Sequence, residues 1–180
     1  MGYLAVLESR RPPPAADPEA FDSWARAVLR AYGHFQLLTP VRQGPWGVEA
    51  LNQRVQHLLA QGPHALLPEA AERPWFEGRP VMVTRNDYAL GLMNGDIGIA
   101  LRLPWGSGPG STRAERRSGS NAPQLRVAFL TSSDIRWVLP SRLQAVETAF
   151  ALTVHKAQGS EFEHIALVLP DTDVPILTRE

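Results

Sequence analysis

The chain has no cysteine and a single lysine among its 180 residues. Without thiols, disulfide bonds and cysteine-ligated zinc sites are excluded, and the absence fits a reducing compartment. Long apolar runs are missing too, since no stretch approaches the roughly 20 residues that cross a bilayer. Residues 1–7 are too short for a signal peptide and lack its charged leader. We therefore expect a cytoplasmic protein without a membrane partner.

A net charge of either sign is also lacking, because 18 basic residues balance 18 acidic ones. The charges are unevenly distributed. Between Arg79 and Arg142 there are nine arginines and four acidic residues, a net excess of five positive charges (9 − 4). Such an excess can face nucleic-acid phosphates. A solvated arginine surface is the alternative, and charge alone favours it.

The N-terminal third predicts a linker, a helix and the start of a parallel sheet. Residues 10–18 are rich in proline and alanine, as linkers are. Asp17 is the predicted N-cap of a helix and Pro18 its first residue. Residues 35–39 form a short apolar run that predicts a buried strand, and residues 48–59 have a helical pattern. The apolar positions of the two helices are Phe21, Trp24, Ala25, Val28 and Leu29 in the first and Leu51, Val55, Leu58 and Leu59 in the second.

The middle of the chain predicts a small β-barrel. Residues 62–78 read as a second linker, after which four short strands are expected at 79–85, 97–103, 125–130 and 134–139. Asn94-Gly95 predicts a type I′ turn between the first two strands. Residues 104–124 are rich in Gly, Ser and Arg, so we expect a mobile loop there. Within it, Trp105 is the best candidate for stacking on a base, whereas Trp24 and Trp137 are expected in the core.

Parallel-sheet patterns return near the end. Residues 148–154 and 164–170 are continuous apolar runs that predict two further buried strands. The simplest topology is a parallel α/β sheet interrupted by an inserted barrel. His155 and His164 lie nine residues apart without a thiol nearby, so no metal site is expected.

The polar segment 153–162, TVHKAQGSEF, follows one of these strands. In open α/β sheets, ligands bind beyond the carboxyl ends of the strands. The segment offers a hydroxyl, an imidazole and the chain's only ammonium in Thr153, His155 and Lys156. Gly159 allows positive φ or a close ligand approach, and Ser160 is a potential N-cap. Glu161 can accept hydrogen bonds from sugar hydroxyls, so the set suits a sugar-phosphate ligand.

This segment resembles motif V of superfamily 1 DNA helicases in its RecD-like form, which includes the alpha subunits of exodeoxyribonuclease V. Residues 36–52 resemble the start of that family's second motor domain, and residues 78–101 resemble the start of its inserted SH3-like barrel. The resemblance implies a partial RecA-like motor domain of the P-loop NTPase type. It implies an N-terminal linker and helix (1–33), two parts of the motor domain (34–77 and 147–180) and the inserted barrel (78–146).

The resemblance also implies roles for particular residues. Thr153, His155 and Lys156 are expected to contact single-stranded DNA, together with Arg85, Asn86 and Asn94 of the barrel. Gly159 and Glu161 are expected at the sugar of ATP, Gln158 near the nucleotide, and Arg42 at a phosphate. Expected partners are the first motor domain of the same protein and the beta and gamma subunits of exodeoxyribonuclease V.

Two motifs of the family are not found in this sequence. The only lysine follows His155, so there is no Gly-Lys-Ser/Thr phosphate loop. The arginine of the last helicase motif is expected beyond the LTRE that ends the sequence. We therefore expect a fragment that holds no catalytic residue and binds neither ATP nor Mg²⁺ alone, whereas the parent helicase uses both. A stand-alone nucleic-acid or protein-binding module and a helicase domain of a plasmid relaxase are the alternatives.

Overall fold

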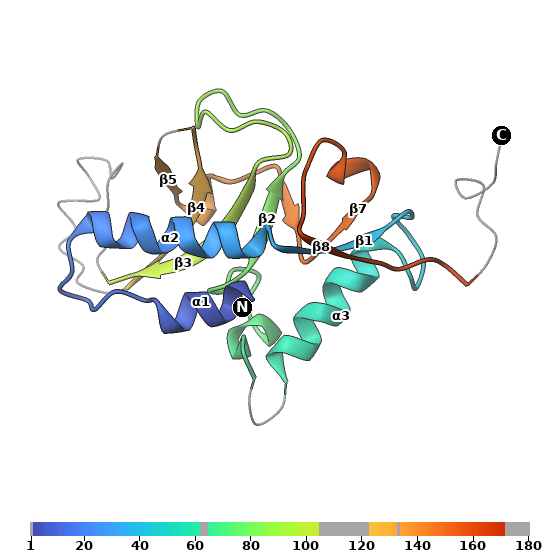
Figure 1. The fold of residues 1–180 in the computed structure, drawn as a ribbon, viewed down its shortest axis with the longest axis horizontal. Coiled ribbons are helices and arrows are strands. Elements are labelled where there is room, and N and C mark those ends of the chain that lie inside the picture. Colours follow the sequence, from blue (N-terminus) through green and yellow to red (C-terminus); the bar gives the residue numbers. More distant parts are fainter. Residues whose placement is uncertain (1, 62–64, 105–122, 133, 172–180) are drawn as a thin grey trace.

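The computed structural model describes residues 2–61, 65–104, 123–132 and 134–171. Trp105 and most of the predicted mobile loop lie outside these ranges. Within them, the chain is an α/β structure with two sheets (Figure 1). The elements are α1 (Tyr3–Ser9), α2 (Pro18–Tyr32), β1 (Phe35–Thr39), α3 (Val48–Ala60), η1 (Pro68–Ala71), β2 (Pro80–Val83), β3 (Ile97–Leu103), β4 (Gln124–Leu130), β5 (Ile135–Val138), η2 (Pro140–Arg142), β6 (Val146–Thr148), β7 (Ala151–Thr153), η3 (His155–Ala157) and β8 (His164–Leu167).

The first sheet is parallel and has three strands in the order β7-β1-β8. The strand predicted at residues 35–39 is confirmed with the same bounds, and it lies at the centre of the sheet. Thr39 at its end pairs with Thr153 of β7, and Leu38 pairs with both Leu152 and Leu167. Parallel pairing therefore brings the carboxyl ends of β1 and β7 to the same edge of the sheet.

Helix α3 follows β1 as predicted and packs on the parallel sheet. Val48 and Leu51 form a buried cluster with Ala151 of β7. The predicted apolar face is wrong at Leu58, which is 73% exposed. The physical reason is visible in Figure 1, where the helix runs away from the sheet toward its C-terminal end.

Helix α2 packs on the antiparallel sheet and has the predicted start. The Asp17 side chain accepts a hydrogen bond of 2.9 Å from the backbone N–H of Ala20. Trp24 and Trp137 lie in one buried cluster with strands β3 to β5, so both tryptophans are in the core as expected. Helix α1, which the sequence did not predict, packs along α2, and Trp24 Nε1 donates to the Leu7 carbonyl over 3.1 Å. None of the helices in the described residues is long and apolar enough to cross a membrane.

The second sheet is antiparallel, with five strands in the order β5-β4-β3-β2-β6. It contains the four strands predicted from the middle of the sequence, and β6 joins at one end. Apolar residues of β2, β3 and β4 form its buried centre. In the described part of the chain, β5 and β6 end the sheet without pairing with one another. The sheet is confirmed, and its closure into a barrel stays a prediction.

The turn expected at Asn94-Gly95 is present, but type I′ is wrong. Gly95 has a φ of +96°, and no non-glycine residue in the described ranges has a positive φ. The Asp96 N–H donates to the Met93 carbonyl over 3.0 Å, so positive φ occurs only at the third position of the turn, as in type II. The side chain of Asn86 accepts the Asn94 N–H over 2.8 Å, which fixes this residue within a longer connection than a two-residue hairpin.

Residues 148–154 do not form the single buried strand that was predicted. Strand β6 belongs to the antiparallel sheet and β7 to the parallel one, and the chain crosses between them at Ala149 and Phe150. Both crossing residues are buried, which explains the continuous apolar run. Tyr32 donates to the Ala149 carbonyl over 2.5 Å, and Gln36 Nε2 donates to the Phe150 carbonyl over 3.1 Å.

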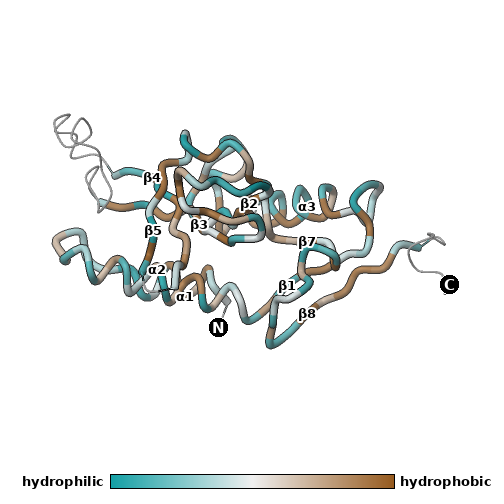
Figure 2. Tube along the Cα trace, turned by 90° about the horizontal axis from the view of Figure 1, so that it is seen from above, coloured by the Kyte–Doolittle hydropathy of each residue, from teal (hydrophilic) through white to brown (hydrophobic). Residues whose placement is uncertain are grey.

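The strand predicted at residues 164–170 is present as β8 but is not buried. Ile165 is 57% exposed and Leu167 51% exposed, because β8 is the edge strand of the parallel sheet. Figure 2 shows this hydrophobic stretch along the outer side of the molecule.

The segment predicted as a linker at residues 62–78 is in part a packed structure. It contains η1, and Leu67, Ala70 and Phe76 are buried with Phe150. Its three prolines and Gly78 indicated a linker, although its apolar residues pack beside α3.

Candidate functional site

The segment 153–162 lies where the sequence predicted, beyond the carboxyl end of β7. The Val154 N–H donates to the Thr39 carbonyl over 3.0 Å, which holds the start of the segment against the end of β1. Arg42 follows β1 at the same edge. Two connections from two parallel strands therefore meet there, the arrangement in which open α/β sheets bind ligands.

The first half of the segment is a hydrogen-bonded turn. The Thr153 hydroxyl accepts the Lys156 N–H over 3.3 Å, and the Ala157 N–H donates to the Val154 carbonyl over 3.2 Å. Gly159 has a φ of +81°, the positive value that the sequence led us to consider. The expectation of Ser160 as an N-cap is wrong, because η3 precedes this residue and no helix follows it in the described range.

The side chains of the segment differ in their access to solvent. His155, Gln158, Gly159 and Glu161 are exposed, whereas Thr153 is buried. The exposed residues are free to meet a ligand. Thr153 instead has its hydroxyl engaged with the backbone of the turn, so its predicted contact with DNA needs the ligand to approach a buried group.

Lys156 is held by a carboxylate from the other sheet. Its Nζ forms an ion pair with Oε1 of Glu147 in β6, and the two side chains are 24% and 32% exposed. Glu147 pairs in register with Met82 of β2. The ion pair thus joins the polar turn to the antiparallel sheet.

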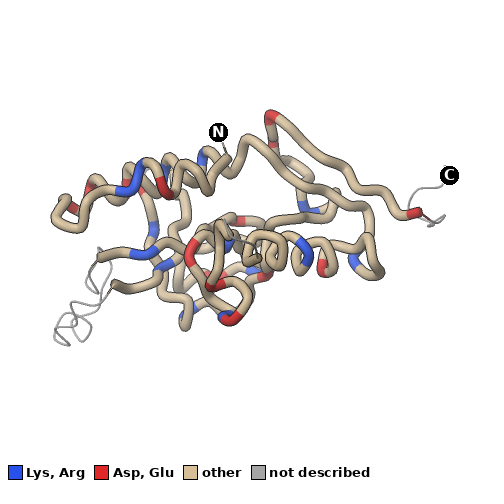
Figure 3. The backbone as a smooth tube through the Cα atoms, turned by 90° about the horizontal axis from the view of Figure 1, so that it is seen from below, with Lys and Arg blue, Asp and Glu red and all other residues tan. Residues whose placement is uncertain are grey.

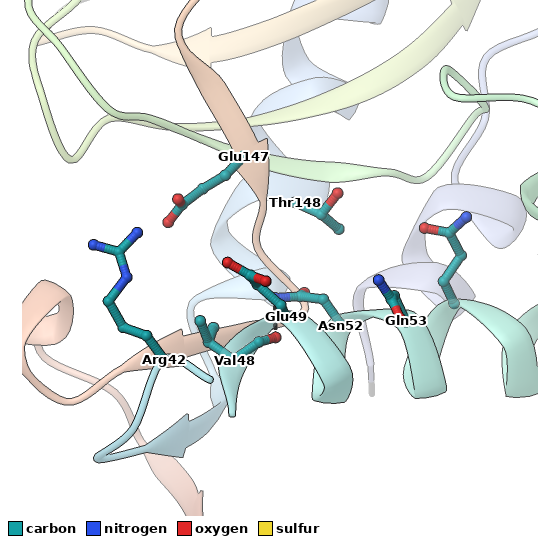
Figure 4. A pocket seen from close by; sticks show the side chains of 8 residues that line it. Arg42, Val48, Glu49, Asn52, Gln53, Glu147 and Thr148 are labelled. Carbon is teal, nitrogen blue, oxygen red and sulfur yellow. Dashed lines mark hydrogen bonds between the residues drawn. The ribbon is translucent and has the colours of Figure 1, made fainter. Parts of the chain in front are cut away.

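Glu147 and Arg42 also line a pocket of about 300 Å³ beside the start of α3. Figure 4 shows the Arg42 guanidinium and the Glu147 carboxylate extending toward one another across it. The remaining lining residues are Val48, Glu49, Asn52, Gln53, Gln56 and Thr148. Of the four residues expected at the nucleotide, only Arg42 lines this pocket. Gln158, Gly159 and Glu161 lie at the same sheet edge but outside it.

The predicted DNA contacts of the antiparallel sheet lie in residues 84–96. Arg85, Asn86 and Asn94 are all exposed there. A hollow of about 230 Å³ separates this connection from the polar turn, with Gly95 on one side and Lys156 and Ser160 on the other. Of the predicted DNA contacts, only Lys156 lines this hollow, and Gly95, the neighbour of Asn94, lines its other side. Figure 3 shows basic and acidic residues interspersed along the described backbone, so no single basic band marks the site.

The described ranges contain no group of three or more His, Asp or Glu side chains that could hold a metal ion. Arg42 and Glu161 offer a guanidinium for phosphate and a carboxylate for a sugar, which fits part of what ATP requires.

Sequence reasoning missed two polar residues that build this edge. Glu147 lies outside every strand predicted from the sequence, and Asn52 lies in the helix predicted at residues 48–59 but is not among its apolar positions. Asn52 is buried and bonds to both backbone groups of Ala151. A polar residue in a helix gave no signal of this role, because only the fold places β7 opposite it.

No family model matches the chain. It is 35% identical over 177 residues to the RecBCD enzyme subunit RecD of Haemophilus influenzae, covering 98% of this chain and 23% of that protein. It is 39% identical over 153 residues to the same subunit of Mycobacterium tuberculosis H37Rv, covering 85% of this chain and 23% of that protein. The ATP-dependent RecD2 DNA helicase of Deinococcus radiodurans is 31% identical over 148 residues, with coverages of 82% and 18%. The chain thus spans less than a quarter of the length of these relatives.

Proposed function

Because this chain is a homologue of a segment of RecD proteins, we propose that it is part of an ATP-dependent 5′-to-3′ DNA helicase, the alpha subunit of an exodeoxyribonuclease V. In this proposal the parallel sheet belongs to the second RecA-like motor domain, and the antiparallel sheet is its inserted SH3-like barrel. The intact protein works with the beta and gamma subunits and hydrolyses ATP with Mg²⁺ in DNA repair and recombination.

The observation that carries the proposal is the meeting of Arg42 and the polar turn at one sheet edge. His155 and the connection at Asn94 face single-stranded DNA, while Arg42 faces a phosphate of ATP and Glu161 its ribose. Gln158 and Gly159 lie between the two ligands. In this proposal, hydrolysis requires the remainder of the protein, which supplies the phosphate loop and the arginine of the last motif.

When ATP and Mg²⁺ bind, they supply the phosphoryl group and the charge neutralisation that its transfer needs. The residues of this chain act on binding and position. The Arg42 guanidinium pairs with a phosphate oxygen, and the Glu161 carboxylate accepts from a ribose hydroxyl. Hydrogen bonds within residues 153–160 hold the turn together. Because His155 and Glu161 lie in and directly after this turn, a movement of the turn displaces both.

DNA binding by the intact protein that contains this sequence tests the assignment. We expect His155→Ala to weaken the binding of a labelled single-stranded oligonucleotide about fivefold, since one hydrogen bond is worth about 1 kcal/mol. His34→Ala is the matched control, because His34 is also exposed but lies before β1, at the opposite edge of the sheet. Fluorescence anisotropy at fixed salt measures both.

Equal affinities for the two variants would contradict the assignment of the carboxyl edge to DNA. The 180-residue chain alone distinguishes the alternative of a stand-alone binding module. Tight binding with a steep loss of affinity as salt rises would favour that module, whereas weak binding favours the helicase segment.

A further inference from the structure

We propose that Glu147 is a positioning residue, which anchors the polar turn through Lys156, and that Lys156 is a tether between the two sheets. This inference rests on the proposed function and revises one expectation within it, since the resemblance places Lys156 among the DNA contacts. The ion pair and the half-buried state of both side chains carry it.

Both ends of Lys156 are fixed within the protein. Its backbone N–H donates to the Thr153 hydroxyl over 3.3 Å, and its ammonium meets the Glu147 carboxylate. The neighbouring His155 is exposed. A DNA phosphate would have to displace the Glu147 carboxylate to reach the ammonium, because the Lys156 side chain is already paired and only 24% exposed. The geometry therefore assigns contact with DNA to His155 and support to Lys156.

The tether spans the place where the chain crosses between sheets. Glu147 belongs to β6, and Lys156 follows β7, with Ala149 and Phe150 between them. The crossing residues are buried and therefore held in place. The ion pair joins Glu147 and Lys156, which lie on either side of them in the chain. A displacement of the antiparallel sheet is thereby passed to the turn, because Glu147 moves with the sheet.

The tether also explains why the chain's only lysine occurs at this position. Seventeen of the eighteen basic residues are arginines. A lysine ammonium is a compact point charge that suits one carboxylate oxygen, whereas the planar arginine fork requires a wider, two-sided partner. Oε1 of Glu147 pairs with Lys156, and the Glu147 carboxylate also extends toward Arg42 (Figure 4).

Amide hydrogen exchange in the 180-residue chain tests the tether without DNA. We expect Glu147→Gln and Lys156→Gln each to speed exchange at Ala157, Gln158 and Ser160 about fivefold, since the ion pair no longer opposes opening of the turn. The double variant should exchange no faster than either single variant, because the two changes remove one interaction. The charge swap Glu147→Lys with Lys156→Glu should restore part of the protection.

Glu49→Gln is the matched control. Glu49 also lines the Arg42 pocket but forms no described bond to Lys156. Its effect on exchange should add to that of Lys156→Gln. The proposal would be overturned if the effects of Glu147→Gln and Lys156→Gln on exchange were additive. It would also be overturned if neither variant changed the exchange rates of the turn.

The salt dependence of DNA binding by the intact protein separates a tether from a phosphate contact. Loss of a phosphate contact reduces the slope of log affinity against log salt by about one. We expect Lys156→Gln to leave the slope unchanged and to lower affinity at every salt concentration by the same factor. A slope reduced by about one would overturn the tether. A complete lack of DNA binding by the wild-type protein would refute the proposed function, while the exchange experiment would still decide the tether.

Discussion

At the scale of single residues, Asn52 completes the edge of the parallel sheet. Its Nδ2 donates to the Ala151 carbonyl over 3.0 Å, and its Oδ1 accepts the Ala151 N–H over 3.0 Å. Strand β7 is an edge strand, and Asn52 gives its backbone the partners that a further strand would supply. The strand that leads into the polar turn is thereby fixed to α3.

Replacement of Asn52 by leucine should destabilise the chain. The variant keeps the side-chain size but leaves two buried backbone groups without partners, so we expect the free energy of unfolding to fall by at least about 2 kcal/mol. Urea denaturation followed by circular dichroism measures it. Gln53→Leu is the control, because Gln53 is the exposed neighbour on the same helix. Equal urea midpoints for Asn52→Leu and Gln53→Leu would show that the Asn52 hydrogen bonds do not contribute to the free energy of unfolding.

Little of this residue-scale detail could be predicted from the sequence. The composition of residues 153–162 indicated a ligand-facing turn, and its position and the positive φ of Gly159 agree. The partners of Lys156 and Asn52 lie 9 and 99 residues away along the chain. Local spacing carries no information on such contacts, because they exist only after the two sheets have assembled.

At the scale of elements, α2 holds the crossing between the two sheets. Tyr32 near its end donates to the Ala149 carbonyl, and Tyr3 of α1 packs edge-on against Tyr32 at 5.6 Å between ring centroids. Tyr3 also donates to the Gly78 carbonyl over 2.9 Å. Burial raises the pKa of both tyrosines, and the neighbouring Tyr32 adds to the increase at Tyr3.

These raised pKa values predict a loss of stability at high pH. A group with a raised pKa in the folded state contributes its full stability below its unfolded pKa, about 10 for tyrosine. The contribution then declines as pH rises through the folded-state pKa. Unfolding free energies measured between pH 8 and 11 should therefore fall above about pH 10.

Two tyrosine variants test the source of this loss. Tyr32→Phe should be less stable at neutral pH by about 1 kcal/mol, through the lost hydrogen bonds, and should depend less on pH above 10. Tyr88→Phe should keep the wild-type pH dependence, because Tyr88 is on the surface. If the unfolding free energy of Tyr32→Phe fell as steeply above pH 10 as that of the wild type, the Tyr32 hydroxyl would not be the source of the loss.

Patterns of apolar residues predicted most helices and strands. They failed where one continuous apolar segment belongs to two different strands. The strands at 35–39 and 97–103 and the start of α2 agree with the prediction because each has one clear period and a cap or turn beside it. The run at 148–154 was assigned to one strand because both sheets bury it. Strand β8 has the composition of a buried strand, yet it lies at an edge, and composition alone cannot tell the two positions apart.

At the scale of the whole molecule, two sheets of different kinds meet around one polar turn. The sequence predicted a parallel sheet interrupted by a β-rich insertion, and the chain crosses between the two sheets as that topology requires. Helix α2 belongs to the same packed body, because it covers the antiparallel sheet. The N-terminal segment is thus a structural part of the molecule, not only a linker.

We propose that the carboxyl edge of the parallel sheet meets ATP through Glu161 and DNA through His155. DNA-stimulated ATP hydrolysis by the intact protein tests it most directly, with Glu161→Ala compared with Glu163→Ala. Both glutamates are exposed and two residues apart, so the charge change is matched. We expect Glu161→Ala to lower kcat/KM for ATP about tenfold or more, through loss of a charge-assisted hydrogen bond, while Glu163→Ala stays near the wild type. Unimpaired hydrolysis in Glu161→Ala, or an equal loss in both variants, would contradict it.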